Sequence, residues 1–298
     1  MQTNWDDLRV FLAVARESSL SAAGKVLRLD PATVGRRMHK LERVLQATLF
    51  SKSPQGYALT EAGTVLLARA EQAEAAMRSA VAELPEATDR LHGQIRIGAP
   101  DGAANYLLPQ VCADIAHDNP DLDIQIVALP RVFNLSRREA DMAVAVSAPT
   151  AGRLIVQKIT DYKLHLAASQ AYLDTHDAIL ATEDLSAHRL VGYIPDMIFD
   201  RELDYLAEMG IKRVALASNS VSVQLHMIRQ GGGLGIVHDF ALPAAPGVRR
   251  LLPEHVSLTR AFYLIRHEDD RRNARLSRFA ERLSTGLRTE VTRLEALT

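Results

Sequence analysis

The stretch DPATVGRRMHKLERVL, residues 30–45, has the pattern of a capped helix that is apolar on one side only. Asp30 is a favourable N-cap residue, and Pro31 suits the first helical position because its missing N–H would have had no helical partner there. The opposite face, with Arg36 and Arg37, is free for polar contacts. Apolar residues recur at i, i+4, i+7 and i+11, as one helical stripe does; they are Val34, Met38, Leu41 and Leu45.

Two shorter helices are predicted before this one. Apolar spacing predicts a first helix over about 5–18. Cap-type serines at 18, 19 and 21, followed by an apolar run, predict a short second helix that ends near Leu27. A tight break at Leu29 and Asp30 separates it from the third helix. This order is typical of a helix-turn-helix, whose last helix enters the major groove of DNA.

A β-hairpin is predicted after the third helix. The segment LFSKSPQGYALTEAG, residues 49–63, has the pattern of a strand, a Ser-Pro-Gln-Gly turn and a strand, which places a wing beside the DNA backbone. Arginine can contact guanine in bidentate fashion and Thr33 can touch a thymine methyl, whereas Lys40 and Arg43 are better placed for phosphates. The predicted DNA contacts are Ser21, Pro31, Ala32, Thr33, Arg36, Arg37, Lys40, Lys52, Ser53 and Gln55.

Charge is unevenly distributed along the chain. The 298 residues are 47% apolar and 24% charged, as in an ordinary soluble globular protein, and their formal net charge is −1. Residues 1–60 hold nine Lys or Arg against five Asp or Glu, a net charge of +4, which leaves −5 for the remainder. A basic helix face alone is more often a solvated surface than a DNA site. The helix order, the Asp-Pro cap and the wing together favour DNA, and the overall charge argues against non-specific DNA compaction.

Several other classes of protein are disfavoured by missing motifs. No apolar run reaches the roughly 18 residues of a membrane span, and the start of the chain lacks the basic region of a signal peptide. The single cysteine, Cys112, cannot form an internal disulfide, so we expect a protein of the reducing cytoplasm. The GGGLG run at 231–235 lacks the Lys-Ser/Thr of a P-loop, the histidines lack metal-ligand spacing, and His238 and Asp239 lack the nucleophile elbow of a serine hydrolase. We expect no enzyme activity, no cofactor and no metal.

A long helix is predicted from Glu61 to about Arg90, because it contains no proline before Pro85 and no glycine after Gly63. Its small and apolar residues are spaced alternately by four and three, as in a heptad seam. We predict that this seam joins two chains, because a helix-turn-helix gains from binding two half-sites. The alternative, an amphipathic helix packed on its own chain, stays open. The predicted dimer seam comprises Leu66, Ala70, Ala73, Met77, Ala80 and Leu84.

Strands and helices alternate in the rest of the chain, which is typical of parallel sheets covered by helices. Two such units, joined by extended crossovers near 160–168 and 260–266, predict a two-lobed α/β fold with a ligand between the lobes. The predicted strands are 95–97, 122–129, 141–146, 153–159, 162–168, 188–193, 213–218, 234–237 and 260–265. The predicted helices include 102–118, a short helix at 131–140, 196–209, 219–230 and 271–287. The predicted domains are 1–60, 61–91 and 92–298, with lobe I at about 92–160 and 266–298 and lobe II at about 161–265.

The N-terminal stretch resembles the winged helix-turn-helix of LysR-type transcriptional regulators. Gly35 stands where relatives usually carry Ser, and Pro31 where Gln is common. A glycine inside a helix costs up to about 1 kcal/mol; here it either removes a hydroxyl that could hold a phosphate or permits a closer approach to DNA. The matching pieces are Phe11-x-x-Val14-Ala15, Ala22-Ala23, Thr33-Val34-x-Arg36-Arg37, Leu41-Glu42, Leu49-Phe50 and Leu59-Thr60-x-x-Gly63.

The remaining chain resembles the effector domain of the same regulators, which is like a periplasmic binding protein in fold. Matching pieces include IRIGAP (95–100), NPDLDIQI (119–126) and GGGLGIV (231–237), so the resemblance covers essentially the whole chain. It implies a homo-oligomer, a dimer or a tetramer, that binds double-stranded promoter DNA and is modulated by a small-molecule effector between the lobes. The implied effector contacts are Pro100, Asp101, Gly102, Ala103, Arg131, Val132, Phe133, Ser147, Tyr193, Ile194, Asn219 and Ser220.

The charge of the implied effector stays open. Organic anions are the commonest effectors of the family, and Arg131 could pair with an acid. Against this, Gly102 stands where a carboxylate-binding relative often has a hydroxyl, Ala145 stands where many have Arg, and Asp101 adds a negative charge. A solute-binding protein or an enzyme on the same fold is the competing hypothesis. It would need an export signal or a catalytic constellation, and the sequence shows neither.

Overall fold

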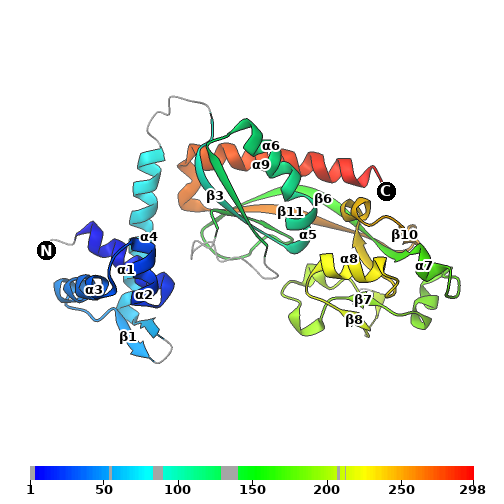
Figure 1. Ribbon diagram of the computed structural model, residues 1–298, viewed down its shortest axis with the longest axis horizontal. Coiled ribbons are helices and arrows are strands. Elements are labelled where there is room, and N and C mark those ends of the chain that lie inside the picture. The colour runs from blue at the N-terminus through cyan, green and yellow to red at the C-terminus, as the bar shows by residue number, and fades with distance from the viewer. Residues whose placement is uncertain (1–3, 54–55, 83–89, 129–139, 207–208, 212) are drawn as a thin grey trace. The chain divides into compact units, whose positions relative to one another are not determined.

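The computed structural model describes residues 4–53, 56–82, 90–128, 140–206, 209–211 and 213–298. The chain divides into two compact units, Met1–Pro85 and Glu86–Thr298, which are described separately (Figure 1). The first unit carries the helix-turn-helix, called the head below, and the second carries the α/β domain, called the effector unit. None of the helices in the described ranges has the length and apolar character that crossing a membrane requires.

The head contains the three predicted helices, and each begins at a capping side chain. The Asp30 carboxylate accepts a hydrogen bond from the backbone N–H of Ala32 at 2.8 Å, as the Asp-Pro pattern predicts. Each helix ends at a residue in the left-handed conformation, which helps to satisfy the last carbonyls. Ser18 is one of these residues (φ 52°), so the first helix stops one residue before its predicted end. The bounds are α1 (Trp5–Glu17), α2 (Leu20–Leu27) and α3 (Pro31–Leu45).

The apolar stripe of α3 forms the centre of the head. Val34, Met38 and Leu41 are buried in one cluster with Phe11 of α1. The ring of Phe11 lies 5.4 Å from that of Phe50, centroid to centroid, which ties the hairpin to the same core. Full burial of such side chains contributes roughly 1.5–3 kcal/mol each, so the stripe fixes which face of α3 is left to solvent. The predicted hairpin is confirmed as antiparallel strands β1 (Phe50–Ser53) and β2 (Gly56–Leu59).

The long helix α4 is described over Glu61–Ala82. Ala70 is buried and Leu66 is partly buried against the core of the head. Arg16 of α1 adds an ion pair with Glu74 of α4, with 2.8 Å between nitrogen and oxygen. The first turns of α4 therefore pack on their own chain, so Leu66 and Ala70 follow the alternative explanation rather than the predicted seam between chains.

The remaining residues of the predicted seam lie further along α4. Ala73 is exposed and the Met77 side chain is 49% exposed in the single chain. These two residues leave a face of α4 without an intrachain explanation. The side chain of Ala80 and the whole of Leu84 lie outside the described residues, as does the predicted end of the helix at 83–89.

The effector unit is built on a seven-stranded sheet. Three neighbouring strands, β4, β3 and β5, are parallel, as the alternation of strands and helices predicts. The other strands pair antiparallel, so the prediction of parallel sheets is wrong for the crossover region. The order is β10-β6-β11-β5-β3-β4, with β9 also on β6; the bounds are β3 (Gly93–Ala99), β4 (Leu122–Ala128), β5 (Met142–Ala145), β6 (Leu154–Ser169), β9 (Gly235–His238), β10 (Val248–Leu251) and β11 (Ser257–His267).

The two runs predicted as separate strands at 153–159 and 162–168 form the single strand β6. β6 pairs antiparallel with β11, and the register shifts after Phe262, where Ile159 is the extra residue on β6. Such a bulge bends a strand and lets it continue, so no turn is needed between the two runs. These long strands connect the two ends of the effector unit and are the crossovers that the sequence predicts (Figure 1).

Two predicted helices differ from the structure. The helix expected over 102–118 is broken at Leu107, because Pro109 has no N–H to offer the carbonyl four residues earlier. The helix expected over 196–209 is replaced by two 3₁₀ turns, and the Asp200 side chain caps the second one. The segment expected as a helix at 131–140 lies almost entirely outside the described residues. The helices and turns in the described ranges are α5 (Asp101–Tyr106), α6 (Leu108–Asp118), α7 (Gln170–Leu173), η2 (Thr182–Ala187), η3 (Pro195–Met197), η4 (Arg201–Leu203), α8 (Val221–Arg229), η6 (Asp239–Ala244), η7 (Glu268–Arg272) and α9 (Ala274–Glu295).

The elements of the effector unit gather at two ends, which are called lobe I and lobe II below (Figure 1). Lobe I holds β3 with α5, α6 and α9, whereas lobe II holds α7 and α8 with a small parallel sheet. The carboxyl ends of β3 and β5, which are neighbours in the sheet, lie at the same edge. The ligand site is expected at this edge, because Asp101 and Ser147, which follow β3 and β5, are among the predicted effector contacts. The small sheet consists of β7 (Val191–Gly192) and β8 (Leu216–Ala217).

Candidate functional site

The start of α3 presents an exposed basic face. The Arg36 guanidinium donates a hydrogen bond from Nη2 to Oγ1 of Thr33 at 3.0 Å. The two residues predicted to contact base edges therefore lie side by side, one turn apart on the same face. Among the predicted contacts, Ser21, Pro31, Ala32, Arg36 and Lys40 are exposed and Thr33 and Arg37 are partly exposed, whereas Gln55 and the side chains of Lys52 and Ser53 lie outside the described residues.

A buried carboxylate, which the sequence did not reveal, lies behind this face. Asp7 of α1 is 5% exposed and forms ion pairs with Lys40 at 3.1 Å and with Arg37 at 3.9 Å. Asp7 orients both cations and offsets part of their charge. Arg36 is held instead by a neutral hydroxyl, so its charge is directed to solvent. Among these cations, Arg36 is thus the best suited to approach a base.

Two glycines of the head have different structural roles. A Cβ on Gly24 would lie 2.7 Å from the carbonyl oxygen of Leu29, so glycine is required where α2 turns toward α3. A Cβ on Gly35 would meet only Leu20 Cδ1 at 3.5 Å, an ordinary contact distance. Packing within the head therefore does not require Gly35.

The predicted effector contacts from the two lobes meet at the N-terminus of α8. Asp101, the first residue of α5 in lobe I, accepts three hydrogen bonds on Oδ2 from lobe II. The donors are Ser220 Oγ at 3.0 Å, Ser222 N at 2.9 Å and Ser222 Oγ at 3.0 Å. Asp101 and Ser220 were predicted to belong to one site, and the structure brings them into direct contact.

A second hydroxyl–carboxylate contact connects the lobes at the end of β5. Ser147 Oγ donates a hydrogen bond to Oδ2 of Asp200, whose other oxygen accepts from the backbone N–H of Glu202. Arg260 of β11 forms an ion pair with Glu202 at 2.8 Å. The sequence predicted Ser147 but missed Asp200 and Glu202, because they lie in a segment expected to be an ordinary helix.

Aromatic rings lie beneath these contacts. Tyr162 of β6 stacks on Phe262 of β11, with 4.1 Å between ring centroids, and it also stacks with His238 at 5.5 Å. Burial lowers the pKa of His238 to about 4, so the imidazole is neutral at pH 7. A Cβ on Gly102 would lie 3.8 Å from this imidazole, which places His238 directly beside the start of α5. Tyr205 completes the group, with its hydroxyl 3.4 Å from His238 Nε2.

The other predicted effector contacts differ in their burial and in the elements that carry them. The Ala103 side chain, in α5, is fully buried in the core, so contact between Ala103 and an effector would have to use its backbone, and this contact stays a prediction. Tyr193 lines a cavity of about 200 Å³ inside lobe II, together with Tyr205, Leu203 and Gln224. Pro100, Ile194 and Asn219 lie in the turns that precede α5, η3 and α8, and Arg131, Val132 and Phe133 lie outside the described residues.

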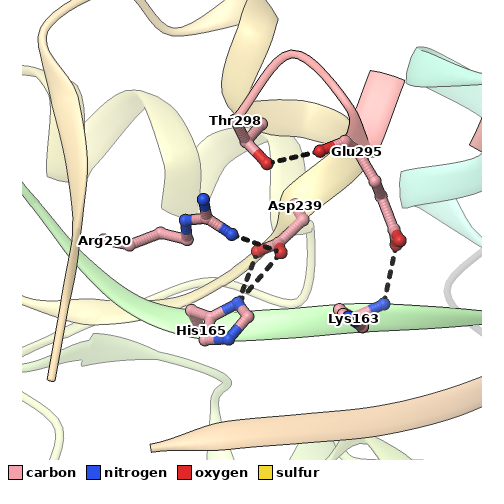
Figure 2. A network of polar contacts seen from close by, with 6 residues as sticks. All are labelled: Lys163, His165, Asp239, Arg250, Glu295 and Thr298. Carbon is pink, nitrogen blue, oxygen red and sulfur yellow. Dashed lines mark hydrogen bonds and ion pairs between the residues drawn. The ribbon is translucent and has the colours of Figure 1, made fainter. Parts of the chain in front are cut away.

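His238 and Asp239, adjacent in sequence, face different partners. The carboxylate oxygens Oδ1 and Oδ2 of Asp239 lie 2.8 and 2.9 Å from His165 Nδ1, and Oδ2 accepts a hydrogen bond from Arg250 Nη1 at 3.2 Å (Figure 2). Glu295, near the end of α9, accepts a hydrogen bond from the backbone N–H of Lys163 in the same region, and burial raises its pKa. The network ties β6, β10 and η6 to the C-terminal helix, so its geometry indicates a structural role rather than a hydrolase triad.

Comparison with known proteins agrees with this geometry. The model of the bacterial regulatory helix-turn-helix protein, lysR family, matches residues 5–64, and that of the LysR substrate binding domain matches residues 88–288. The chain belongs to the LysR family. It is a LysR-type DNA-binding transcriptional regulator with an effector-binding domain, and the resemblance seen in the sequence is confirmed.

Relatives of this LysR-type regulator are similar over most of their length. The transcriptional regulator PtxR of Pseudomonas aeruginosa is 23% identical over 84% of this chain and 82% of its own. The transcriptional activator TtdR of Escherichia coli is 27% identical over 84% of this chain and 83% of its own. Two solved structures share the fold: CrgA of Neisseria meningitidis (TM-score 0.58, 23% identity, 96% and 99% of the two chains) and a full-length OxyR variant of P. aeruginosa (TM-score 0.73, 18% identity, 96% and 98%).

Proposed function

We propose that this regulator binds promoter DNA as a homo-oligomer, with the start of α3 in the major groove and the β1–β2 hairpin on the adjacent backbone. The observation that carries the proposal is the Thr33–Arg36 pair on the exposed face of a helix that is capped, buried on its other side and backed by Asp7. Arginine reads guanine through two parallel hydrogen bonds. We place this function in the cytoplasm, where such DNA is found.

Binding to the intergenic DNA upstream of its own gene tests the proposal, with fluorescence anisotropy measured across a salt series. Arg36→Ala should weaken binding about 5- to 150-fold, equivalent to about 1–3 kcal/mol, and relax the preference at one base pair. Arg9→Ala on α1 is the matched control, because it removes the same charge from an exposed position of the same unit. Equal losses for the two variants would show that only the net charge of the head matters, and would contradict base contact by Arg36.

Two heads are joined, in this proposal, through the face of α4 that carries Ala73 and Met77. An exposed Met beside small residues suits close packing of two helices, and paired heads bind half-sites one or more DNA turns apart. Further pairing of effector units into a tetramer belongs to the same proposal. Met77→Glu should lower the mass in solution from that of an oligomer to that of a monomer, as measured by light scattering. An unchanged mass would remove this face of α4 from the interface.

The effector acts, in this proposal, between the lobes that Asp101 and Ser147 bridge. A small molecule bound there shifts the population between two arrangements of the lobes and so changes the spacing of the paired heads. A ligand with equal affinity for both arrangements would switch nothing. Substitution of Tyr193, which lies at this junction and lines the cavity of lobe II, by Ala should abolish the effector response and leave DNA binding without effector unchanged. Loss of both would show a folding defect instead.

A further inference from the structure

The Asp101 carboxylate occupies a position in which a bound anion would be expected. Its Oδ2 atom lies 2.9 Å from the backbone nitrogen of Ser222 and 3.0 Å from each of two serine hydroxyls at the start of α8. Its Oδ1 atom accepts from Nδ2 of Asn105, one turn along its own helix, at 3.1 Å. Both carboxylate oxygens are therefore satisfied, and the three donors on Oδ2 come from the opposite lobe.

The electrostatics of α8 favour an anion at this point. α8 spans nine residues, and its first backbone N–H groups have no partners within the helix. Helix N-termini carry a partial positive charge and bind carboxylates and phosphates for this reason. The Ser220 side chain caps one of these groups, the N–H of Val223, and Asp101 takes the N–H of Ser222. The N–H groups of Ser222 and Val223 and the hydroxyls of Ser220 and Ser222, which could hold the acid group of a ligand, are thus used by the chain itself.

Other charges between the lobes reinforce the negative character of the junction. Asp200 and Glu202 add two carboxylates, and Glu202 forms an ion pair with Arg260. The neighbouring rings are uncharged at pH 7: burial keeps His238 neutral and raises the pKa of Tyr193, which Asp101 raises further. An organic anion entering here would meet the Asp101 and Asp200 carboxylates and an occupied helix terminus.

We propose that Asp101 is an internal carboxylate ligand, which latches the two lobes together and excludes organic acids from the N-terminus of α8. This inference rests on the proposed effector site between the lobes and assigns its ligand class: the effector is neutral or cationic where it reaches this end of α8. Asp101 is thereby a specificity-determining residue. The latch is a property of the folded chain alone, so it is tested without effector or DNA.

Chemical rescue of the Asp101→Ala variant is the decisive experiment. Alanine retains the Cβ atom, so formate replaces the missing carboxylate atom for atom. The full-length variant is heated in 100 mM sodium formate and in 100 mM sodium chloride, and scanning calorimetry follows the effector unit. We expect the midpoint in chloride to fall by about 4–8 °C from the loss of charge-assisted hydrogen bonds, and formate to restore at least half of it. The wild type should show no difference between the two salts.

Three controls separate the latch from a general effect. Ser147→Ala breaks the second hydroxyl–carboxylate contact between the lobes without vacating α8, so its midpoint should fall without any response to formate. Asp101→Asn keeps an oxygen and an amide in the same place, so it also should not respond. The single tryptophan, Trp5, lies in the head and reports that unit separately by fluorescence. Its transition should be the same in all variants.

Each contrary result has a definite meaning. An unchanged midpoint for Asp101→Ala, or a lowered midpoint that formate does not raise, would overturn the latch, because the carboxylate would then not be an independent ligand of α8. Equal stabilisation of wild type and variant by formate would also overturn it, since the end of α8 would be open to anions. Failure of the proposed DNA-binding function would appear instead in the Arg36→Ala titration and would leave the formate result unaffected.

Discussion

The starts of α3 and α8 are both satisfied by an aspartate, but the two aspartates come from different distances along the chain. Asp30 caps α3 from the residue before it, with 2.8 Å from Oδ1 to the N–H of Ala32. Asp101 reaches α8 from the other lobe, 121 residues away from Ser222, at 2.9 Å. A local cap leaves the helix surface open to a large anion such as DNA, whereas a distant cap closes the helix end and joins two bodies. The same side chain therefore exposes one site and closes the other.

Acid should destabilise the effector unit more than the head, and this is the largest effect that we expect. The folded-state pKa of His238, about 4, lies below its usual value of 6.5, so the unfolded chain binds a proton that the folded effector unit excludes. The stabilising contribution of neutral His238 is complete above pH 6.5 and is lost as the pH falls toward 4. The loss amounts to about 3 kcal/mol between pH 7 and pH 4.

Urea unfolding at several pH values measures this contribution. Circular dichroism follows both units, and Trp5 fluorescence follows the head alone. His238→Gln should remove most of the pH-dependent loss from the effector unit and leave the head unchanged. If wild type and variant lose the same free energy between pH 7 and pH 4, other groups carry the acid sensitivity and the neutral imidazole contributes little.

The fold of the head follows from local rules, which is why the sequence predicted it well. The Asp-Pro cap and the stripe of Val34, Met38 and Leu41 act within single helices, and the structure has the predicted helices and hairpin almost to the residue. Errors in the effector unit occur where distant partners decide the outcome. β6 runs as one strand because β11 pairs along it through a bulge at Ile159. The break at Leu107 is an exception, because Pro109 is a local signal from which it could have been predicted.

Predicting the site residues was harder than predicting the elements that carry them. Asp101 and Ser220 could be assigned to one site through family resemblance, but no sequence pattern shows that they bind each other. Asp7 has the pattern of an ordinary acidic residue of a first helical turn, yet it is buried behind the basic face of α3. No sequence pattern marks His165, although it and Asp239 form the centre of the network in Figure 2. In each case the missing information was a contact between segments far apart in the chain.

Removal of the Asp30 cap should have a smaller effect on stability, confined to the head. Asp30→Ala should lower the free energy of unfolding of the head by about 1 kcal/mol, the usual value of an N-cap. The effect is modest because α3 starts at the surface, where water can replace the lost acceptor. Urea unfolding followed by Trp5 fluorescence measures it, and formate should not restore it measurably. A loss as large as that of Asp101→Ala, or a clear rescue by formate, would remove the distinction between the two caps.

Lys40→Ala tests whether the basic residues of α3 contact phosphates or bases. Lys40 faces phosphates in our proposal, so its loss should weaken binding to all sequences alike and reduce the salt slope by about 0.9. The decrease should be smaller than for Arg36→Ala, because the ion pair with Asp7 already offsets part of the charge of Lys40. Anisotropy titrations on specific and random duplexes supply both quantities. A sequence-dependent loss would assign Lys40 to a base instead.

The smallest expected effect comes from Gly35, and it decides between two explanations of that residue. Gly35→Ala should stabilise the head by about 0.5–1 kcal/mol, because alanine suits a helix interior better and the new Cβ would lie at an ordinary 3.5 Å from Leu20. Gly24→Ala is the opposite control, since its Cβ would lie 2.7 Å from the Leu29 carbonyl and must destabilise the head. If the stabilised Gly35→Ala head binds DNA as tightly as before, the glycine merely replaces a hydroxyl that this protein does not use. If the same head loses more than tenfold in affinity, the missing side chain is what lets α3 approach the bases, and the exposed helix start is shaped for DNA by its glycine as much as by its arginines.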